Sequence, residues 1–191
     1  DGKDQALSSS DIIVGPTGGK TPQLYGPMNQ VWHRPVCYVW ADDGPAVYRH
    51  YVAWLLSWWS IIGNGHGCGL PLSALSADIQ AQNNIVFVGV AQADVPGGDK
   101  LPIQWTSNTV SVAGKSFSES AFGFIFPNAA GDRLTGYIKA AAGHEQLLFR
   151  YTPFSSRAGM PDFFVFGASG LTSAGFFDAD WKLDPQYAEG L

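Results

Sequence analysis

A serine, a histidine and an aspartate stand where they could act as nucleophile, base and orienting acid. Ser169 lies in the segment 167–171, whose first glycine and central serine are similar to a Gly-x-Ser-x-Gly nucleophile turn. His144 and Asp42 each follow a segment that we expect to be a strand. Leu171 replaces the last glycine of that turn, which normally permits close packing behind it, so we favour an ordinary loop at Ser169.

These side chains could meet only at one edge of a sheet, because ligands of open α/β sheets collect at the carboxyl ends of the strands. Asp43 follows Asp42 directly, and Gln92 follows the expected strand 85–90, so both are further candidates for binding at this edge. Asp43 also precedes an expected helix and could cap it instead. Solvated loop residues are the plain alternative for the whole group.

The histidines and cysteines do not have the spacing of a metal site. The four histidines form no His-x-x-x-His pair and have no Cys-x-x-Cys companion, so we expect neither a metal nor a cofactor. The glycine-rich segment 65–69 lacks the lysine of a phosphate-binding loop. Cys37 and Cys68 could form one disulfide closing a loop of about 30 residues, or they could remain two buried thiols.

The composition limits the classes of partner. The chain has 191 residues, of which 46% are apolar and only 14% charged, and its formal net charge is −5. This charge has the wrong sign for nucleic acid or an anionic membrane surface, and no apolar run reaches the roughly 20 residues of a membrane span. Few lysines, many small polar residues and a start at Asp1 without methionine predict a trimmed, soluble, extracellular or secreted protein.

The apolar pattern predicts the elements that would position these residues. Continuous apolar runs at 36–40 and 85–90 are typical of strands buried on both faces, and the spacing over 47–62 predicts a helix. Further expected elements are short helices at 76–82 and 145–151 and strands at 109–115, 121–127, 134–140 and 163–166. We therefore predict an extended N-terminal arm, residues 1–30, and a single α/β domain, residues 31–191. Its expected fold is a three-layer α/β/α sandwich, flavodoxin-like, with a mixed, mostly parallel sheet.

The helix expected over 47–62 is apolar around most of its circumference and carries Trp54, Trp58 and Trp59. Such a helix is either deeply buried or in contact with a second protein surface. We favour an interface with a catalytic domain or a partner chain. The alternative is that exposed tryptophan rings stack on the sugars of a glycan.

Several short segments, taken in order, resemble one known kind of domain. They are 26–32, 34–36, 83–89, 101–103, 123–128, 143–144, 160–163 and 174–181. Their order and spacing resemble the C-terminal domain that follows the catalytic α/β-hydrolase domain in some large secreted serine hydrolases of the prolyl-oligopeptidase type. The resemblance covers nearly the whole chain from Gly26, although the segment 128–132 has fewer prolines than that family usually has. It implies that the domain accompanies a hydrolase, not that it carries the nucleophile.

We therefore expect a non-catalytic accessory domain or processed subunit of a secreted serine hydrolase or peptidase, packed on its catalytic domain. One alternative is a free-standing extracellular glycan-binding protein that uses exposed tryptophans. Another is a small serine hydrolase that uses Ser169, His144 and Asp42. Neither nucleic acid nor a membrane is an expected partner.

Overall fold

The computed structural model describes residues 19–150 and 160–191. The expected arm 1–30 therefore lies largely outside the described residues, which begin at Gly19. The α-helices of the described part are α1 (Ala46–Ile62) and α2 (Ala77–Gln82), and its 3-10 helices are η1 (Met28–His33), η2 (Leu72–Ala74), η3 (Gln92–Asp94), η4 (Gly98–Lys100) and η5 (Glu145–Arg150). Its strands are β1 (Val36–Trp40), β2 (Gly67–Pro71), β3 (Asn84–Val88), β4 (Ile103–Trp105), β5 (Thr109–Val112), β6 (Lys115–Ser118), β7 (Ala121–Pro127), β8 (Leu134–Ala140), β9 (Phe163–Gly167), β10 (Gly170–Phe177) and β11 (Leu183–Glu189).

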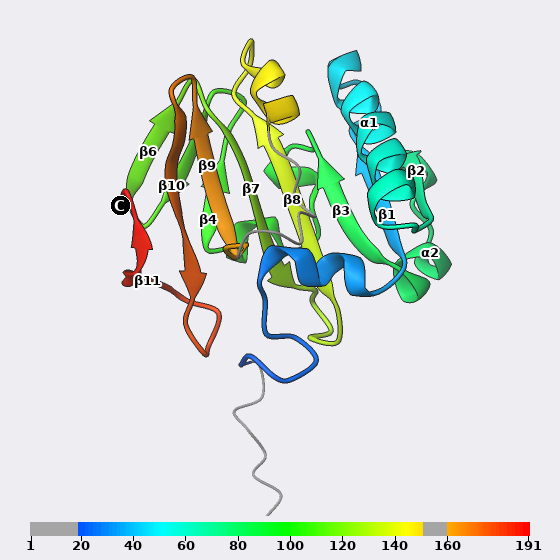
Figure 1. Cartoon of the computed structure of the whole chain (residues 1–191), viewed down its shortest axis with the longest axis horizontal. Helices are drawn as coiled ribbons and strands as arrows, with labels where there is room; N and C mark the ends of the chain where they lie inside the picture. The colour runs from blue at the N-terminus through cyan, green and yellow to red at the C-terminus, as the bar shows by residue number, and fades with distance from the viewer. Residues whose placement is uncertain (1–18, 151–159) are drawn as a thin grey trace, which may run out of the picture.

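The strands form two sheets (Figure 1). The large sheet has eight strands in the order β11-β10-β9-β7-β8-β3-β1-β2, and the small one has three in the order β4-β5-β6. Strands β2, β1, β3 and β8 run parallel to one another, and β1 and β3 are buried apart from Trp40 at the end of β1. Burial on both faces explains their continuous apolar sequences.

Helix α1 covers one face of the parallel strands. Tyr48, Tyr51, Val52 and Leu55 are its buried residues, and their spacing of three and four places them on one side of the helix. A Cβ added to Gly69 of β2 would meet Val52, so this glycine allows α1 to pack closely on the sheet. The 3-10 helices η1 and η5 lie on the same side of the sheet, in contact with β8 (Figure 1).

The other half of the large sheet is antiparallel, and here the predicted flavodoxin-like α/β/α sandwich is wrong. Strands β8, β7, β9, β10 and β11 pair antiparallel in turn, so the sheet is not mostly parallel. Short connections such as residues 168–169 can join only antiparallel strands, because a parallel crossover needs a dozen or more residues. The mixture of helices and strands was predicted correctly, but the described part contains few helices and is dominated by its sheets.

The second face of the large sheet is covered by α2 and by the small sheet, not by a full layer of helices. Trp105 of β4 packs there against Phe122 and Phe124 of β7 and Tyr137 of β8, with ring centroids 5.6–5.9 Å apart. Phe122 and Phe124 are two positions apart on β7, so they project from the same face. The small sheet therefore buries the aromatic side of the antiparallel strands.

Most of the expected elements are confirmed within about two residues. They are the strands at 36–40, 85–90, 121–127, 134–140 and 163–166 and the helices at 47–62 and 76–82. The segment 109–115 is the first strand and turn of a hairpin, and 145–150 is a 3-10 helix. The prediction missed β2, β4, β6, β10 and β11. No helix within the described residues is long and apolar enough to cross a membrane.

Candidate functional site

Four of the predicted site residues follow strands that end at the same edge of the large sheet. Asp42 follows β1, Gln92 follows β3, His144 follows β8 and Ser169 follows β9. Strands β1, β3 and β8 are parallel, and β9 shares their direction because both β8 and β9 are antiparallel to β7 (Figure 1). The carboxyl ends of these four strands therefore define one rim.

The strand order nevertheless keeps the three expected catalytic residues apart. Strand β7 lies between β8 and β9, and β3 lies between β8 and β1. At about 4.8 Å per strand, the ends of β9 and β1 are roughly 19 Å apart. No hydrogen bond in the described part of the chain joins Ser169, His144 or Asp42 to another of the three. The rim does not assemble a nucleophile, a base and an acid in contact.

Asp42 has a structural partner instead. Its carboxylate accepts hydrogen bonds from the backbone N of Ser73, at 2.9 Å, and from the Ser73 hydroxyl. These bonds hold the pKa of Asp42 below its ordinary value and fix η2 beside the end of β1. Asp43 is exposed, and the N-cap of α1 is Pro45, with no side-chain capping bond.

Gln92 connects the loop after β3 to the small sheet. Its amide nitrogen donates to the carbonyl of Gly98, at 2.7 Å, and to the side chain of Gln104, and its amide oxygen accepts from the backbone N of Trp105, at 2.6 Å. Both polar atoms of Gln92 are therefore engaged within the fold. A hollow of about 480 Å³ opens beside it, lined in part by Trp105 and the half-buried Lys139.

Lys139 is a half-buried cation at the end of β8, beside this rim. Its ammonium lies 3.3 Å from the Gly89 carbonyl and 5.6 Å from the centroid of the Tyr48 ring. Burial lowers the pKa of Lys139, and the charge of Glu145 opposes that shift. The partly buried Lys139 amine thus contacts Gly89 and Tyr48. No hydrogen bond among the described residues joins it to Ser169, His144 or Asp42.

Gly89, where the chain leaves β3 at this rim, has φ +73°. An added Cβ would overlap the ring of Tyr48, whose hydroxyl donates to the Ala140 carbonyl at 3.1 Å. We expect Gly89→Ala to lower the free energy of unfolding by about 2 kcal/mol, because backbone strain and overpacking add. Urea denaturation of the variant and the wild type measures this free energy of unfolding. Gly97→Ala is the control, since Gly97 has φ +69° but open space around it, and equal losses in the two variants would contradict the packing argument.

The C-terminal end of α1 exposes three large apolar side chains. Trp58 is 38% exposed, Ile61 77% and Ile62 55%, and the segment 53–62 has no charged residue. We call Trp58, Ile61 and Ile62 the α1 patch. Exposed apolar side chains that gather in this way usually mark an interaction surface.

The other two tryptophans of α1 are half-buried, and Trp54 contacts Trp58 of the patch. Trp54 stacks on Tyr51, packs against Phe149 of η5 and touches Trp58 edge-on, with ring centroids 5.3–6.1 Å apart within this cluster. Trp59 lies over Gly63 and Gly65, where a side chain would collide with its indole. Of the seven tryptophans, all within the described residues, only Trp58 is exposed.

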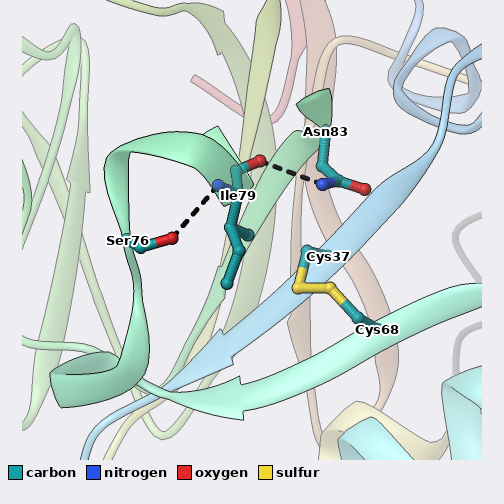
Figure 2. The surroundings of a disulfide bond; sticks show 5 residues. All are labelled: Cys37, Cys68, Ser76, Ile79 and Asn83. Atoms are coloured by element: carbon teal, nitrogen blue, oxygen red, sulfur yellow. Dashed lines mark hydrogen bonds between the residues drawn. A yellow bond between two sulfur atoms is a disulfide. The ribbon is translucent and has the colours of Figure 1, made fainter. Parts of the chain in front are cut away.

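Of the two alternatives for Cys37 and Cys68, the structure has the disulfide. Cys37 of β1 and Cys68 of β2 are register partners with Cα atoms 4.5 Å apart and are joined by a disulfide. Figure 2 shows the disulfide beside α2, whose N-cap Ser76 accepts from the Ile79 backbone N at 3.2 Å. The disulfide thus fixes the edge strand β2 to the buried strand β1.

The described residues contain no group of three or more His, Cys, Asp and Glu side chains that could hold a metal ion. No protein-family model and no curated protein sequence matches this chain.

Proposed function

We propose that this chain is a non-catalytic accessory domain or subunit of a secreted serine hydrolase, and that the α1 patch docks on the catalytic α/β-hydrolase domain. The observation that carries the proposal is the exposure of Trp58, Ile61 and Ile62 at one end of a helix that is otherwise packed on the sheet. Tryptophan is among the residues most often found at the energetic hot spots of protein interfaces.

The separation of Ser169, His144 and Asp42 supports placing the chemistry on the partner. A serine nucleophile needs its base within hydrogen-bond reach, and here intervening strands separate the three residues. We propose a hydrolase as the partner because the segments between Gly26 and Trp181 resemble, in their order, a domain that accompanies such an enzyme. The disulfide favours an oxidising, extracellular compartment, where such bonds persist.

Glycan binding has weaker support. A carbohydrate platform of this kind needs several exposed tryptophans, and Trp58 is the only exposed one among the described residues. Its ring also packs edge-on against Trp54. The other two residues of the α1 patch, Ile61 and Ile62, are aliphatic and would pack against the apolar surface of a protein partner.

We expect Trp58→Ser and Ile61→Ser each to raise the Kd for the catalytic domain at least 30-fold, because a hot-spot truncation costs about 2 kcal/mol or more. Isothermal titration of the purified chain with the hydrolase from its source measures this Kd. Tyr187→Ser is the matched control, since Tyr187 is also exposed but lies on β11, at the far edge of the large sheet.

An activity-based label separates this proposal from catalysis by the chain itself. A fluorophosphonate should label a serine of the catalytic domain and leave Ser169 unmodified, and Ser169→Ala should leave the hydrolysis rate unchanged. Labelling of Ser169, or equal binding by the Trp58 and Tyr187 variants, would contradict the proposal.

A further inference from the structure

A second site lies on the face of the large sheet away from α1. Gly69, which faces α1, is paired with Tyr38, and Tyr38 is paired in turn with Val86 of β3. The alternation of side chains therefore directs Ile85 and Phe87 to the opposite face. A pocket of about 490 Å³ opens there, between α2, the loop around η4 and the β7–β8 turn. Its volume falls in the range of small-molecule sites.

The floor of the pocket is apolar and well ordered by packing. Ile85, Phe87, Leu134 and Tyr137 line it, and each is buried within the fold. The rings of Phe87 and Tyr137 stack with centroids 5.9 Å apart. An apolar group bound in the pocket would contact this apolar lining.

The mouth of the pocket carries positive charge in a negatively charged protein. Lys100 and Arg133 line it, and none of its lining residues among those described is an aspartate or a glutamate. The whole chain has 16 acidic and 11 basic residues, so the net charge of the pocket lining is opposite in sign to that of the chain. An anionic ligand would find two cations and no opposing carboxylate in the lining.

Arg133 is held in place by its own turn. The backbone N of Asn128 donates to the Arg133 carbonyl at 2.9 Å, and the backbone N of Arg133 donates to the Asn128 side-chain oxygen at 3.3 Å. The Arg133 side chain is 22% exposed, and its Nε lies 4.0 Å from the carboxylate of Asp132, which is 62% exposed. A pair at this distance and exposure is weak, so the guanidinium can bind an anion.

We propose that this pocket binds a small organic anion with a flat apolar body, such as an aromatic carboxylate or sulfonate. The body lies against the apolar lining to which Ile85, Phe87 and Tyr137 contribute, and the anionic group pairs with Arg133 and Lys100. This site is independent of the proposed docking through α1, because it lies on the other face of the sheet.

The test compares two fluorescent probes that share a body and differ in charge. The probes are 8-anilinonaphthalene-1-sulfonate and the uncharged N-phenyl-1-naphthylamine. We expect Arg133→Gln to raise the Kd of the sulfonate about tenfold, the cost of losing one charged hydrogen bond, and to leave the Kd of the neutral probe nearly unchanged. Ala130→Trp, which places a bulky ring among the lining residues, should weaken both probes.

Two controls keep the result specific. Lys115→Gln removes an exposed charge of β6, outside the lining of the pocket, and should leave both Kd values unchanged. Ile61→Ser removes the most exposed side chain of the α1 patch, where these probes could also bind. Sulfonate binding that is unaffected by Arg133→Gln, or abolished by Ile61→Ser, would overturn the proposal, and neither outcome would bear on docking to a hydrolase.

Discussion

Replacing Lys20 with methionine is expected to lower the free energy of unfolding by about 3–5 kcal/mol at pH 8, because it removes one partner of a buried ion pair. The Lys20 ammonium lies 2.6 Å from the carboxylate of Asp162, whose side chain is 0% exposed. The same ammonium donates to the Phe177 carbonyl at 2.7 Å and lies 5.0 Å from the centroid of the Trp181 ring. Lys20 thus ties the start of the described chain to β10 and to the turn before β11.

The loss in Lys20→Met should depend on pH in a defined direction. Burial raises the pKa of Asp162, and the hydrogen bond and charge of Lys20 oppose that shift. Without Lys20 the folded-state pKa rises further above the unfolded value of about 3.9, so the folded state binds more protons than the unfolded chain. The free energy of unfolding of the variant then falls as pH rises through this interval, and the loss is smaller at pH 4 than at pH 8.

Urea denaturation at pH 4 and pH 8 measures both effects. Lys20→Met combined with Asp162→Asn should recover much of the loss at pH 8, because the buried group is then neutral and can still accept from the Phe177 backbone N. Lys182→Met is the matched control. Its partner Asp180 is 3.4 Å away and both are well exposed, so about 1 kcal/mol or less is expected. A loss in Lys20→Met that is the same at both pH values would contradict the assignment to Asp162.

Removing the disulfide with Cys37→Ala and Cys68→Ala together is expected to lower the free energy of unfolding by about 3–4 kcal/mol, because the unfolded chain gains the entropy of an open loop. The two cysteines are 31 residues apart in the sequence. Alanine is used because Cys37 is fully buried, and a serine would leave a hydroxyl in the core.

Urea denaturation of the wild type with and without a reducing agent provides the comparison. The reduced wild type and the double-alanine variant should lose similar amounts. Hydrogen exchange should quicken most at β2, since this edge strand pairs only with β1. A loss below about 1 kcal/mol in both samples would contradict the claim that the disulfide secures this edge.

Strands and helices with strong local patterns were predictable from the sequence. The apolar runs at β1 and β3 and the helical spacing of α1 depend on burial that the sequence records directly. Strand β2, with the sequence GCGLP, has no such pattern. Its glycines are required because α1 packs closely over it, and that contact is visible only in the folded chain.

The balance between parallel and antiparallel pairing was harder to predict. The sequence predicts the strands 121–127 and 134–140 of this half, but it does not predict β10 and β11. Strand β11 contains Pro185, which a strand tolerates at the edge of a sheet because an outward-facing N–H has no partner to lose. Without these two strands the sequence underestimates the antiparallel half of the large sheet, which is why a mostly parallel sheet is the wrong prediction.

The candidate sites also depend on strand pairing that the local sequence pattern does not predict. The sequence could place Asp42, Gln92, His144 and Ser169 after strands, but the separation between them depends on the strand order, which interposes β3 and β7. The pocket with Lys100 and Arg133 was missed because its lining comes from segments near residues 80–87, 96–101 and 126–137. Of the candidate surfaces, only the α1 patch could be predicted from a short stretch of sequence, because the expected helix is apolar and carries three tryptophans.

The most direct test of the accessory role is the native mass of the protein isolated from its source, with sequencing of any chain that accompanies it. We predict a species larger than 20.5 kDa that contains a catalytic α/β-hydrolase domain with a Gly-x-Ser-x-Gly serine, on the same polypeptide or on a partner chain. That serine, and not Ser169, should react with the fluorophosphonate. A lone 20.5 kDa monomer without such a domain would contradict the proposed function.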